Sequence, residues 1–360
     1  MNSRERVIKS LEHQEPDRVP LDGSFRGEHW RKFIEYFKTR DKDKILDKLG
    51  IDFRVIGMEA SEAFRKNAIY HHGLPGVPFH VLPDGLLEDE WGIRYKPLGN
   101  LVENRVYFPL QHVESVSEYE FPDIDAPGRF DRAEKLAKKY GGKYALVGNL
   151  GWTLFEAAWH LRGFETFIKD LYVNPKFAED LLDKLLKFRL EEGKRLLEFN
   201  PDIIALGDDL GGQNGMLLSP NIWRRFFKPR MKILIDELKK KGNVYIYYHS
   251  DGYIEPIIPD IVEIGVDILN PVQPECMNPE KIKREYGDKL TLHGTISCQK
   301  TLPFGTTEDV KNEVLTRIKT LGCGGGLILA PACPMPGPEV PLENILTLYE
   351  TALKYKLKRA

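Results

Sequence analysis

The sequence predicts an α/β protein with the fold of a (β/α)8 barrel, or TIM barrel, in which parallel strands alternate with helices. From about residue 131 onward, segments with helical spacing of apolar residues alternate with short, continuously apolar segments. Such continuous runs are typical of strands buried on both faces of a parallel sheet. The predicted strands start near residues 18, 52, 144, 203, 244, 266, 290 and 326, which makes eight. A Rossmann sheet is disfavoured, because no Gly-x-Gly-x-x-Gly motif follows a predicted strand, and there is no P-loop.

The N-terminal part supplies the first two strands of this barrel. Asn2 or Ser3 is suited to cap a first helix, and Pro16 ends it. Gly50 is placed to end the last helix before the second strand. The expected elements are a helix over 3–13, a strand over 18–23, helices over 28–38 and 41–49, and a strand over 52–57.

The segment from about 60 to 130 is interpreted as an insertion between strands two and three. Its periodic apolar runs are few, so it would struggle to bury a core of its own. Within it, residues 91–97 and 101–109 look like the strands of a β-hairpin, separated by Gly99 and Asn100. The whole chain, residues 1–360, is therefore predicted to be a single domain.

The remainder of the chain repeats the alternation of helix and strand. Asn174 precedes Pro175, and proline is favoured at the first position of a helix. Helices are expected over 132–140, 153–171, 175–199, 219–241, 253–264, 279–286, 307–321 and 342–355. Strands are expected over 144–149, 203–207, 244–249, 266–269, 290–294 and 326–330.

Composition narrows the classes of partner. The formal net charge of -2 gives no electrostatic reason to expect a nucleic acid or an anionic membrane as partner. The four cysteines form no Cys-x-x-Cys pair, a pattern that fits reduced thiols in the cytoplasm. The first twenty residues contain no apolar signal region, and no apolar run is long enough to span a membrane. Small molecules or proteins are the expected partners.

Polar side chains follow most of the predicted strands at their carboxyl ends, which meet at one mouth of a barrel. These residues are Asp22, Arg26, Glu59, Asn149, Trp152, Asp208, Asp209, Gln213, His249, Asp251, Gln273, Glu275, Cys276, His293, Ser297, Cys298 and Cys333. His249, Cys333 and one or two carboxylates at the same mouth fit a mixed N/S/O zinc site. A thiolate ligand lowers the effective charge of the metal, which suits activation of a soft nucleophile.

Each of these residues also has a structural interpretation. Asp208 and Asp209 are of a type that caps turns, because Asp side chains readily accept hydrogen bonds from backbone amides. Cys298 has an alternative role as a small apolar residue. His293 is placed to lie within its strand and face the core. His249 is itself open to interpretation as a histidine that merely ends a barrel strand.

Several short motifs carry a resemblance to a known family. They are Asn2-Ser-Arg-Glu-Arg-Val7, Glu15-Pro-Asp-Arg-Val-Pro20, Asp89-Glu-Trp-Gly92, Gly207-Asp-Asp-Leu-Gly211, Ser219-Pro220 with Phe227-Lys-Pro229, His293-Gly294, and Leu302-Pro-Phe-Gly305. Together they are specific to the uroporphyrinogen decarboxylase superfamily, which the chain resembles over nearly all of its length. The resemblance implies a (β/α)8 barrel and two alternative chemistries. One group decarboxylates a tetrapyrrole without a cofactor, and the other exchanges methyl groups with a corrinoid protein.

The resemblance to the decarboxylase group is poor where its chemistry lies. The Arg-Gln-Ala-Gly-Arg segment of that group is Asp22-Gly-Ser-Phe-Arg-Gly27 here, which leaves only Arg26 to hold a substrate carboxylate. Its Phe-Ser-Asp-Ile segment is Ile56-Gly-Met-Glu59. A substrate with several carboxylates favours several fixed guanidinium groups. Decarboxylation in porphyrin biosynthesis, which would depend on Arg26 and Glu59, is therefore the second choice.

The resemblance to the methyltransferase group implies a zinc site. The ligands of that group follow the pattern His-x-Cys after one strand, with a second Cys after the last strand. His249 matches the first ligand and Cys333 the last, and Asp251 stands where the group has its first Cys. Zinc accepts an oxygen ligand in this position, and Glu275 is the expected fourth ligand. The harder ligand set favours an oxygen-linked methyl donor.

The resemblance thus implies a methyltransferase that moves a methyl group between a small-molecule donor, such as a methyl ether or an alcohol, and a corrinoid protein or a thiol. Its expected cofactors are zinc and the corrinoid of a partner protein. The residues predicted to be catalytic are Asp208, Asp209, His249 and Asp251, and those predicted to bind the cofactor are Asn149, Gln213 and Arg26. The Cys-to-Asp change at Asp251 leaves open a non-catalytic member that binds a corrinoid or tetrapyrrole. A homodimer is also left open.

Overall fold

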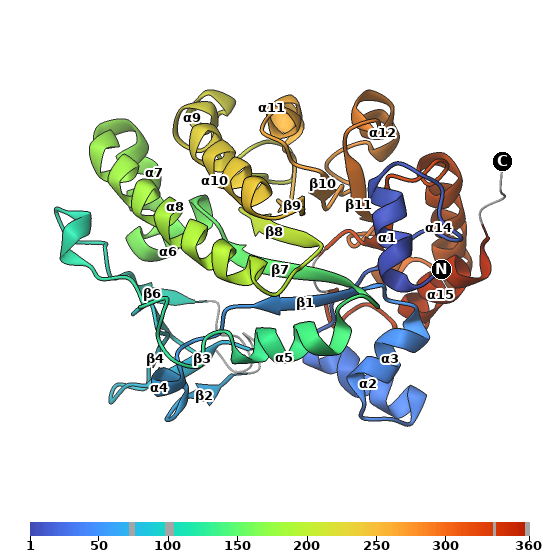
Figure 1. Ribbon diagram of the computed structural model, residues 1–360, viewed down its shortest axis with the longest axis horizontal. Coiled ribbons are helices and arrows are strands. Elements are labelled where there is room, and N and C mark those ends of the chain that lie inside the picture. The colour runs from blue at the N-terminus through green and yellow to red at the C-terminus, as the bar shows by residue number, and fades with distance from the viewer. Residues whose placement is uncertain (72–75, 98–103, 334–335, 357–360) are drawn as a thin grey trace.

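A curled parallel sheet forms the centre of the computed structural model, which describes residues 1–71, 76–97, 104–333 and 336–356. The seven strands lie in the order β1-β7-β8-β9-β10-β11-β12, and helices surround them (Figure 1). The strands are β1 (Phe53–Gly57), β7 (Ala145–Trp152), β8 (Ile203–Gly207), β9 (Tyr245–His249), β10 (Ile268–Asn270), β11 (Thr291–Ile296) and β12 (Leu327–Pro331). All residues of β8, β11 and β12 are buried, as their continuous apolar sequences predict. The fold is α/β and resembles a TIM barrel.

The predicted strand over 18–23 is not formed as a strand, which corrects the count of eight. Leu21 makes an isolated parallel bridge to Leu329 of β12. On the other side, the Leu21 carbonyl accepts a hydrogen bond of 2.9 Å from the amide of Asp52. Pro20 has no amide hydrogen, so this segment cannot extend its ladder toward the N-terminus. Residues 20–22 therefore occupy the place of the predicted first strand with only a short set of hydrogen bonds.

The side chain of Asp52 holds this segment in place. It is fully buried and accepts hydrogen bonds from Arg6 Nη1 at 2.8 Å, Arg18 Nη1 at 2.8 Å and the amide of Leu21 at 2.9 Å. A buried carboxylate is tolerated when it is paired and its oxygens are satisfied, as they are here. Three parts of the N-terminal region thus meet at one side chain.

The helices largely follow the sequence-based expectations. They are α1 (Ser3–Leu11), α2 (Gly27–Phe37), α3 (Lys42–Leu49), α4 (Glu62–Arg65), α5 (Asp131–Tyr140), α6 (Phe155–Arg162), α7 (Phe164–Val173), α8 (Pro175–Leu197), α9 (Pro220–Phe226), α10 (Lys228–Lys241), α11 (Ile258–Glu263), α12 (Pro279–Tyr286), α13 (Thr301–Phe304), α14 (Thr307–Leu321) and α15 (Leu342–Lys354). Asn2 caps α1 through a capping box with Glu5, as predicted.

Two helices that were expected to be continuous are each broken in two. The helix predicted over 153–171 is interrupted at Gly163, which separates α6 from α7 and has φ of 85°. Only glycine adopts such a backbone readily. The helix predicted over 219–241 breaks between α9 and α10. Pro229 lies in the first turn of α10 and cannot donate the backbone hydrogen bond that would continue α9.

The insertion between β1 and β7 forms a small antiparallel sheet of its own. Its strands are β2 (Ile69–Tyr70), β3 (Pro78–Val81), β4 (Leu87–Glu88), β5 (Arg94–Tyr95) and β6 (Arg105–Tyr107), in the order β2-β3-β4-β5-β6. Figure 1 shows them at the lower left, at one end of the parallel sheet. Strands β5 and β6 pair antiparallel, whereas the predicted hairpin turn at Gly99 and Asn100 lies outside the described residues.

The insertion leaves and rejoins the barrel at one place. The amide of Glu59 donates to the carbonyl of Arg129 at 2.9 Å, and Arg129 Nη1 donates back to the carbonyl of Glu59 at 3.1 Å. The same guanidinium reaches both carboxylate oxygens of Glu90, at 2.8 Å and 3.0 Å. Arg129 therefore joins the two ends of the insertion to its middle.

Candidate active site at the barrel mouth

The polar ends of the strands converge on a cavity of about 850 Å3. We call it the metal cavity, because three of its side chains form a group able to hold a metal ion. Its lining residues include Asp22, Asn149, Glu156, Asp209, His249, Asp251, Asn270, His293 and Cys333. The lining residues come from distant parts of the sequence and from the ends of different strands. This is the position expected of an active site in a barrel.

Three side chains in this cavity form a group able to hold a metal ion. Asp209, His249 and Asp251 each offer one ligand atom, and these atoms all lie within 4.8 Å of one another. His249 Nε2 is 3.4 Å from Asp209 Oδ1. The group is assembled by parallel pairing of β8 with β9, in which Gly207 is in register with His249. Imidazole nitrogen and carboxylate oxygen are both ordinary ligands of zinc.

A hydrogen-bond chain fixes the orientation of the His249 ring. His249 Nδ1 lies 2.6 Å from Asn270 Oδ1, and Asn270 Nδ2 lies 2.6 Å from His293 Nδ1. His293 Nε2 lies 2.9 Å from Asp22 Oδ2. With the Asp22 carboxylate as acceptor, His293 Nε2–H donates to Asp22 Oδ2, so His293 Nδ1 accepts from the Asn270 amide. The Asn270 carbonyl oxygen is then left to accept from His249 Nδ1.

This order of donors and acceptors leaves His249 Nε2 without a proton. The free lone pair belongs to the same atom that lies near Asp209. Histidine ligands of metals usually donate their other ring N–H to a neighbouring acceptor, which sets the tautomer. The side chain of His249 is therefore prepared to bind a cation through Nε2.

The carboxylates of the mouth are crowded, which disfavours their charged forms. Burial raises the pKa of Asp251 to about 6, with a further rise from Asp209 and an opposing effect of His249. Burial, with added repulsion from Asp209 and Asp208, raises the pKa of Glu156 to about 8. Negative charges held close together in a partly buried site favour a cation between them.

Asp208, a predicted catalytic residue, lies outside this group. Its buried carboxylate accepts hydrogen bonds from the amides of Leu154 at 3.1 Å and Glu156 at 2.9 Å. These amides belong to the N-terminal end of α6, where a negative charge is stabilised by the helix dipole. Asp208 thus orients the helix that carries Glu156. It accepts hydrogen bonds from backbone amides, as its alternative structural interpretation predicted.

Cys333, predicted as a zinc ligand, lines the same cavity but is not one of the three grouped residues. Its thiol contacts that of Cys298, and this contact together with burial raises the pKa of Cys298. Asn149, predicted to bind the cofactor, also lines the cavity, and its Oδ1 accepts a hydrogen bond of 3.0 Å from the amide of Gly151.

Glu275, Gln213 and Arg26 are not brought to the metal cavity. The Glu275 carboxylate accepts a hydrogen bond from the Ser297 hydroxyl. The backbone carbonyl of Glu275 accepts one of 3.4 Å from Gln213 Nε2. Arg26 precedes α2, outside the residues that line the cavity. Among the described residues, these three therefore neither line the metal cavity nor belong to the group able to hold a metal ion.

Sequence reasoning missed Glu156 and Asn270. Glu156 lies in the first turn of α6, after the polar end of β7, and acidic residues are common in first turns, so its type and position alone do not indicate a site. Asn270 ends β10, directly before Pro271, and pairs with His293, which was predicted to lie at the mouth with a position in the core as the alternative. His293 is indeed buried within β11, yet it reaches Asp22 and lines the cavity.

Comparison with known proteins identifies one family. The family model described as uroporphyrinogen decarboxylase (URO-D) matches residues 97–355. A search of curated proteins finds no match. Among the helices of the described residues, none combines the length and apolar character needed to cross a membrane.

Solved structures with a similar fold include a methyltransferase from Methanosarcina mazei. It has a TM-score of 0.69 and 18% sequence identity, with 98% of this chain and 99% of that chain covered. A B12-independent methionine synthase from Shewanella sp. W3-18-1 has a TM-score of 0.41 and 14% identity, with 95% of each chain covered. A GH113 β-1,4-mannanase has a TM-score of 0.43 and 9% identity, with 94% of this chain and 99% of that chain covered. At these identities the likeness to the first structure concerns the fold.

Proposed function

The chain belongs to the uroporphyrinogen decarboxylase family, and within that family we propose that it is a metal-dependent methyltransferase. It moves a methyl group between a small-molecule donor, such as a methyl ether or an alcohol, and a corrinoid protein or a thiol. The metal is zinc, and the cobalt of the corrinoid belongs to a partner protein. The methyltransferase from Methanosarcina mazei with the same fold supports this choice of group.

The observation that carries the proposal is the orientation and tautomer of the His249 ring, which the contact with Asn270 fixes. Its Nδ1 hydrogen is engaged by Asn270, and its Nε2 faces Asp209 in a group that includes Asp251. One nitrogen and two carboxylate oxygens fit a zinc ion, and Cys333 on the same cavity is the candidate sulfur ligand. When bound, the metal would act as a Lewis acid on the oxygen of the donor or bind the thiol of the acceptor as thiolate.

The remaining residues of the cavity supply orientation and a proton. The chain of Asn270, His293 and Asp22 keeps His249 in one tautomer. Glu156 lines the cavity, and its pKa of about 8 keeps a proton on its carboxyl group at neutral pH. An alcohol that leaves a methyl ether needs such a proton on its oxygen.

The cavity gives less support to a porphyrinogen decarboxylase. Of the arginines that line it, Arg54 is buried and bonded to Asp47 at 2.7 Å, and Arg132 lies 3.2 Å from Glu59. Arg26, the residue that the decarboxylase alternative needs, does not line the described cavity. A substrate with several carboxylates would therefore find few free guanidinium groups.

The proposal is tested by metal analysis and by methylation of free cob(I)alamin with a methyl ether, followed by absorbance. We expect wild-type protein to hold about one metal ion per chain. His249→Ala and Cys333→Ala should lower both metal content and methylation, and His112→Ala, a change of an exposed histidine, should alter neither. A wild-type protein that binds no metal after reconstitution would overturn the proposal and favour a non-catalytic binding protein.

A further inference from the structure

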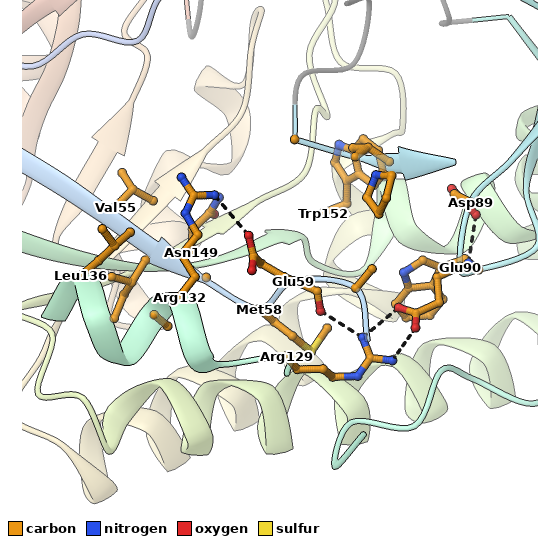
Figure 2. Close-up of a pocket in the computed structure, with 18 of the residues that line it drawn as sticks. Val55, Met58, Glu59, Asp89, Glu90, Arg129, Arg132, Leu136, Asn149 and Trp152 are labelled. Carbon is orange, nitrogen blue, oxygen red and sulfur yellow. Dashed lines mark hydrogen bonds and ion pairs between the residues drawn. The ribbon is translucent and has the colours of Figure 1, made fainter. Parts of the chain in front are cut away.

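A second cavity of about 640 Å3 lies beside the metal cavity, between the barrel and the insertion (Figure 2). Five residues line both cavities, namely Ser24, Val55, Arg132, Asn149 and Trp152. The two cavities therefore adjoin at a shared wall.

Apolar side chains form much of the second cavity. Val55 and Met58 come from β1 and the residue after it, Leu136 comes from α5, and Trp91 comes from the insertion. Figure 2 shows Val55 and Leu136 at one side of the cavity, near Arg132. These surfaces suit the apolar body of an organic molecule, because their burial by a ligand is favourable.

Arg132 supplies an available positive charge at the shared wall. Its side chain is 66% exposed, and its hydrogen bond to Glu59 Oε1 measures 3.2 Å. The other oxygen of Glu59 already accepts from Arg65 Nη1 at 2.5 Å. Two guanidinium groups thus share one carboxylate, which leaves an excess of one positive charge. Exposed ion pairs contribute little free energy, so a ligand carboxylate can replace Glu59 as the partner of Arg132.

The other charged residues of this cavity are satisfied by the protein. The buried guanidinium of Arg129 is bonded to both oxygens of Glu90. Asp89 is buried too, and it accepts from the amides of Trp91 at 2.9 Å and Ile93 at 3.0 Å and from the Tyr95 hydroxyl at 2.8 Å. Among the described residues that line the second cavity, Arg132 is therefore the cation whose ion pair, to Glu59, is exposed enough to be exchanged for one with a ligand anion.

We propose that the second cavity binds the anionic part of the methyl donor, so that the donor is a small organic anion. Its carboxylate binds Arg132, its apolar body lies against Val55, Met58 and Trp152, and its O-methyl group extends across the shared wall into the metal cavity. Guanidinium and carboxylate form strong, directional pairs, which makes Arg132 a determinant of specificity. The identity of the ligand as a methyl donor rests on the proposed function.

The experiment compares two probes, 4-methoxybenzoate and methoxybenzene, which differ only in the carboxylate. Their affinities are measured by titration calorimetry with metal-free protein. Arg132→Gln should weaken binding of 4-methoxybenzoate about tenfold, as loss of a hydrogen bond between charged groups predicts. Binding of methoxybenzene should not change. Arg31→Gln, a change of an arginine that is 76% exposed and lines neither cavity, serves as the matched control.

Glu59→Gln gives a prediction of opposite sign. It removes the carboxylate that competes for Arg132, so binding of 4-methoxybenzoate should become tighter. The inference is overturned if Arg132→Gln leaves the affinity for 4-methoxybenzoate unchanged or weakens both probes equally. Because these titrations contain no metal, that failure is separate from a failure of the proposed methyl transfer. Loss of metal binding with an intact preference for the carboxylated probe would contradict the methyltransferase alone.

Discussion

His249 Nδ1 lies 2.6 Å from Asn270 Oδ1, and this contact decides which nitrogen of His249 is offered to the cavity. The histidine ends β9 and the asparagine ends β10, and these two residues are in register between the paired strands. The amide of Asn270 is in turn held by His293. The His249 ring at the mouth is thus oriented by residues outside the group of Asp209, His249 and Asp251.

Asn270→Ala should weaken metal binding without abolishing it. The change frees His249 to rotate and to place its proton on either nitrogen, and loss of such an outer partner typically lowers metal affinity about 10- to 100-fold. Zinc titration measures the affinity, and ¹⁵N chemical shifts of the metal-free protein report the tautomer of His249. Asn221→Ala, at an exposed position of α9, is the control. Unchanged affinity and an unchanged tautomer would show that the chain does not orient His249.

Metal binding should weaken as the pH falls through about 6. The Asp251 carboxyl must lose its proton to bind a metal, and burial raises its pKa to about 6. Protons therefore compete below that pH, whereas above it the carboxylate is already ionised and this dependence ends. Zinc titrations from about pH 5 to about pH 8 measure the effect. The zinc affinity of Asp251→Asn should be lower at every pH tested. Its pH dependence should lack the contribution that Asp251 makes near pH 6 in the wild type.

Asp52→Asn should destabilise the fold strongly. The change leaves the guanidinium groups of Arg6 and Arg18 without their shared carboxylate. Removing one partner of a buried ion pair costs about 3 to 5 kcal/mol. Urea unfolding measures the loss. Asp180→Asn, which removes an exposed carboxylate paired with Lys176, should change the free energy of unfolding by no more than about 0.5 kcal/mol.

The stability of Asp89→Asn relative to wild type should rise with pH. Burial raises the pKa of Asp89 from 3.8 to about 6, against the opposing hydrogen bonds of Tyr95, Ile93 and Trp91. As the pH rises from 3.8 to about 6, the unfolded chain ionises at Asp89 before the folded protein does, so the wild type loses stability. The loss amounts to about 3 kcal/mol and stays constant above that range.

Urea unfolding of wild type and Asp89→Asn over this pH range tests the prediction. The asparagine does not titrate, so the difference in free energy of unfolding should shift in favour of the variant as the pH rises. Asp84→Asn, at an exposed position in the same insertion, is the control. A difference that does not depend on pH would contradict the buried, proton-retaining state of Asp89.

Sequence patterns predicted the parallel sheet well because its strands are continuous apolar runs, as in β8 and β12. They predicted a strand over 18–23, but Pro20 has no amide hydrogen to donate, and the Leu21 amide donates to the side chain of Asp52 instead of to a neighbouring strand. They also missed the break at Gly163, since a single glycine within a helical pattern is often tolerated.

The candidate site could be predicted only in part. His249 and Asp251 are two residues apart, so one strand end brings them together, and the parallel neighbour β8 brings Asp209. Glu275 was expected to join them because it follows the next strand, yet its side chain turns to Ser297. Such a choice between partners depends on loop conformation, which residue type and spacing do not encode.

The joined ends of the insertion have a consequence for how such a protein can diversify. Glu59 and Arg129 are hydrogen-bonded neighbours, so the segment between them can be exchanged as a cassette while the strands on either side keep their register. The barrel would retain the proposed metal ligands after such a graft. The new segment would reshape the wall of the second cavity that carries Trp91, whereas Arg132 would remain, so the proposed site could serve anionic donors of different shapes.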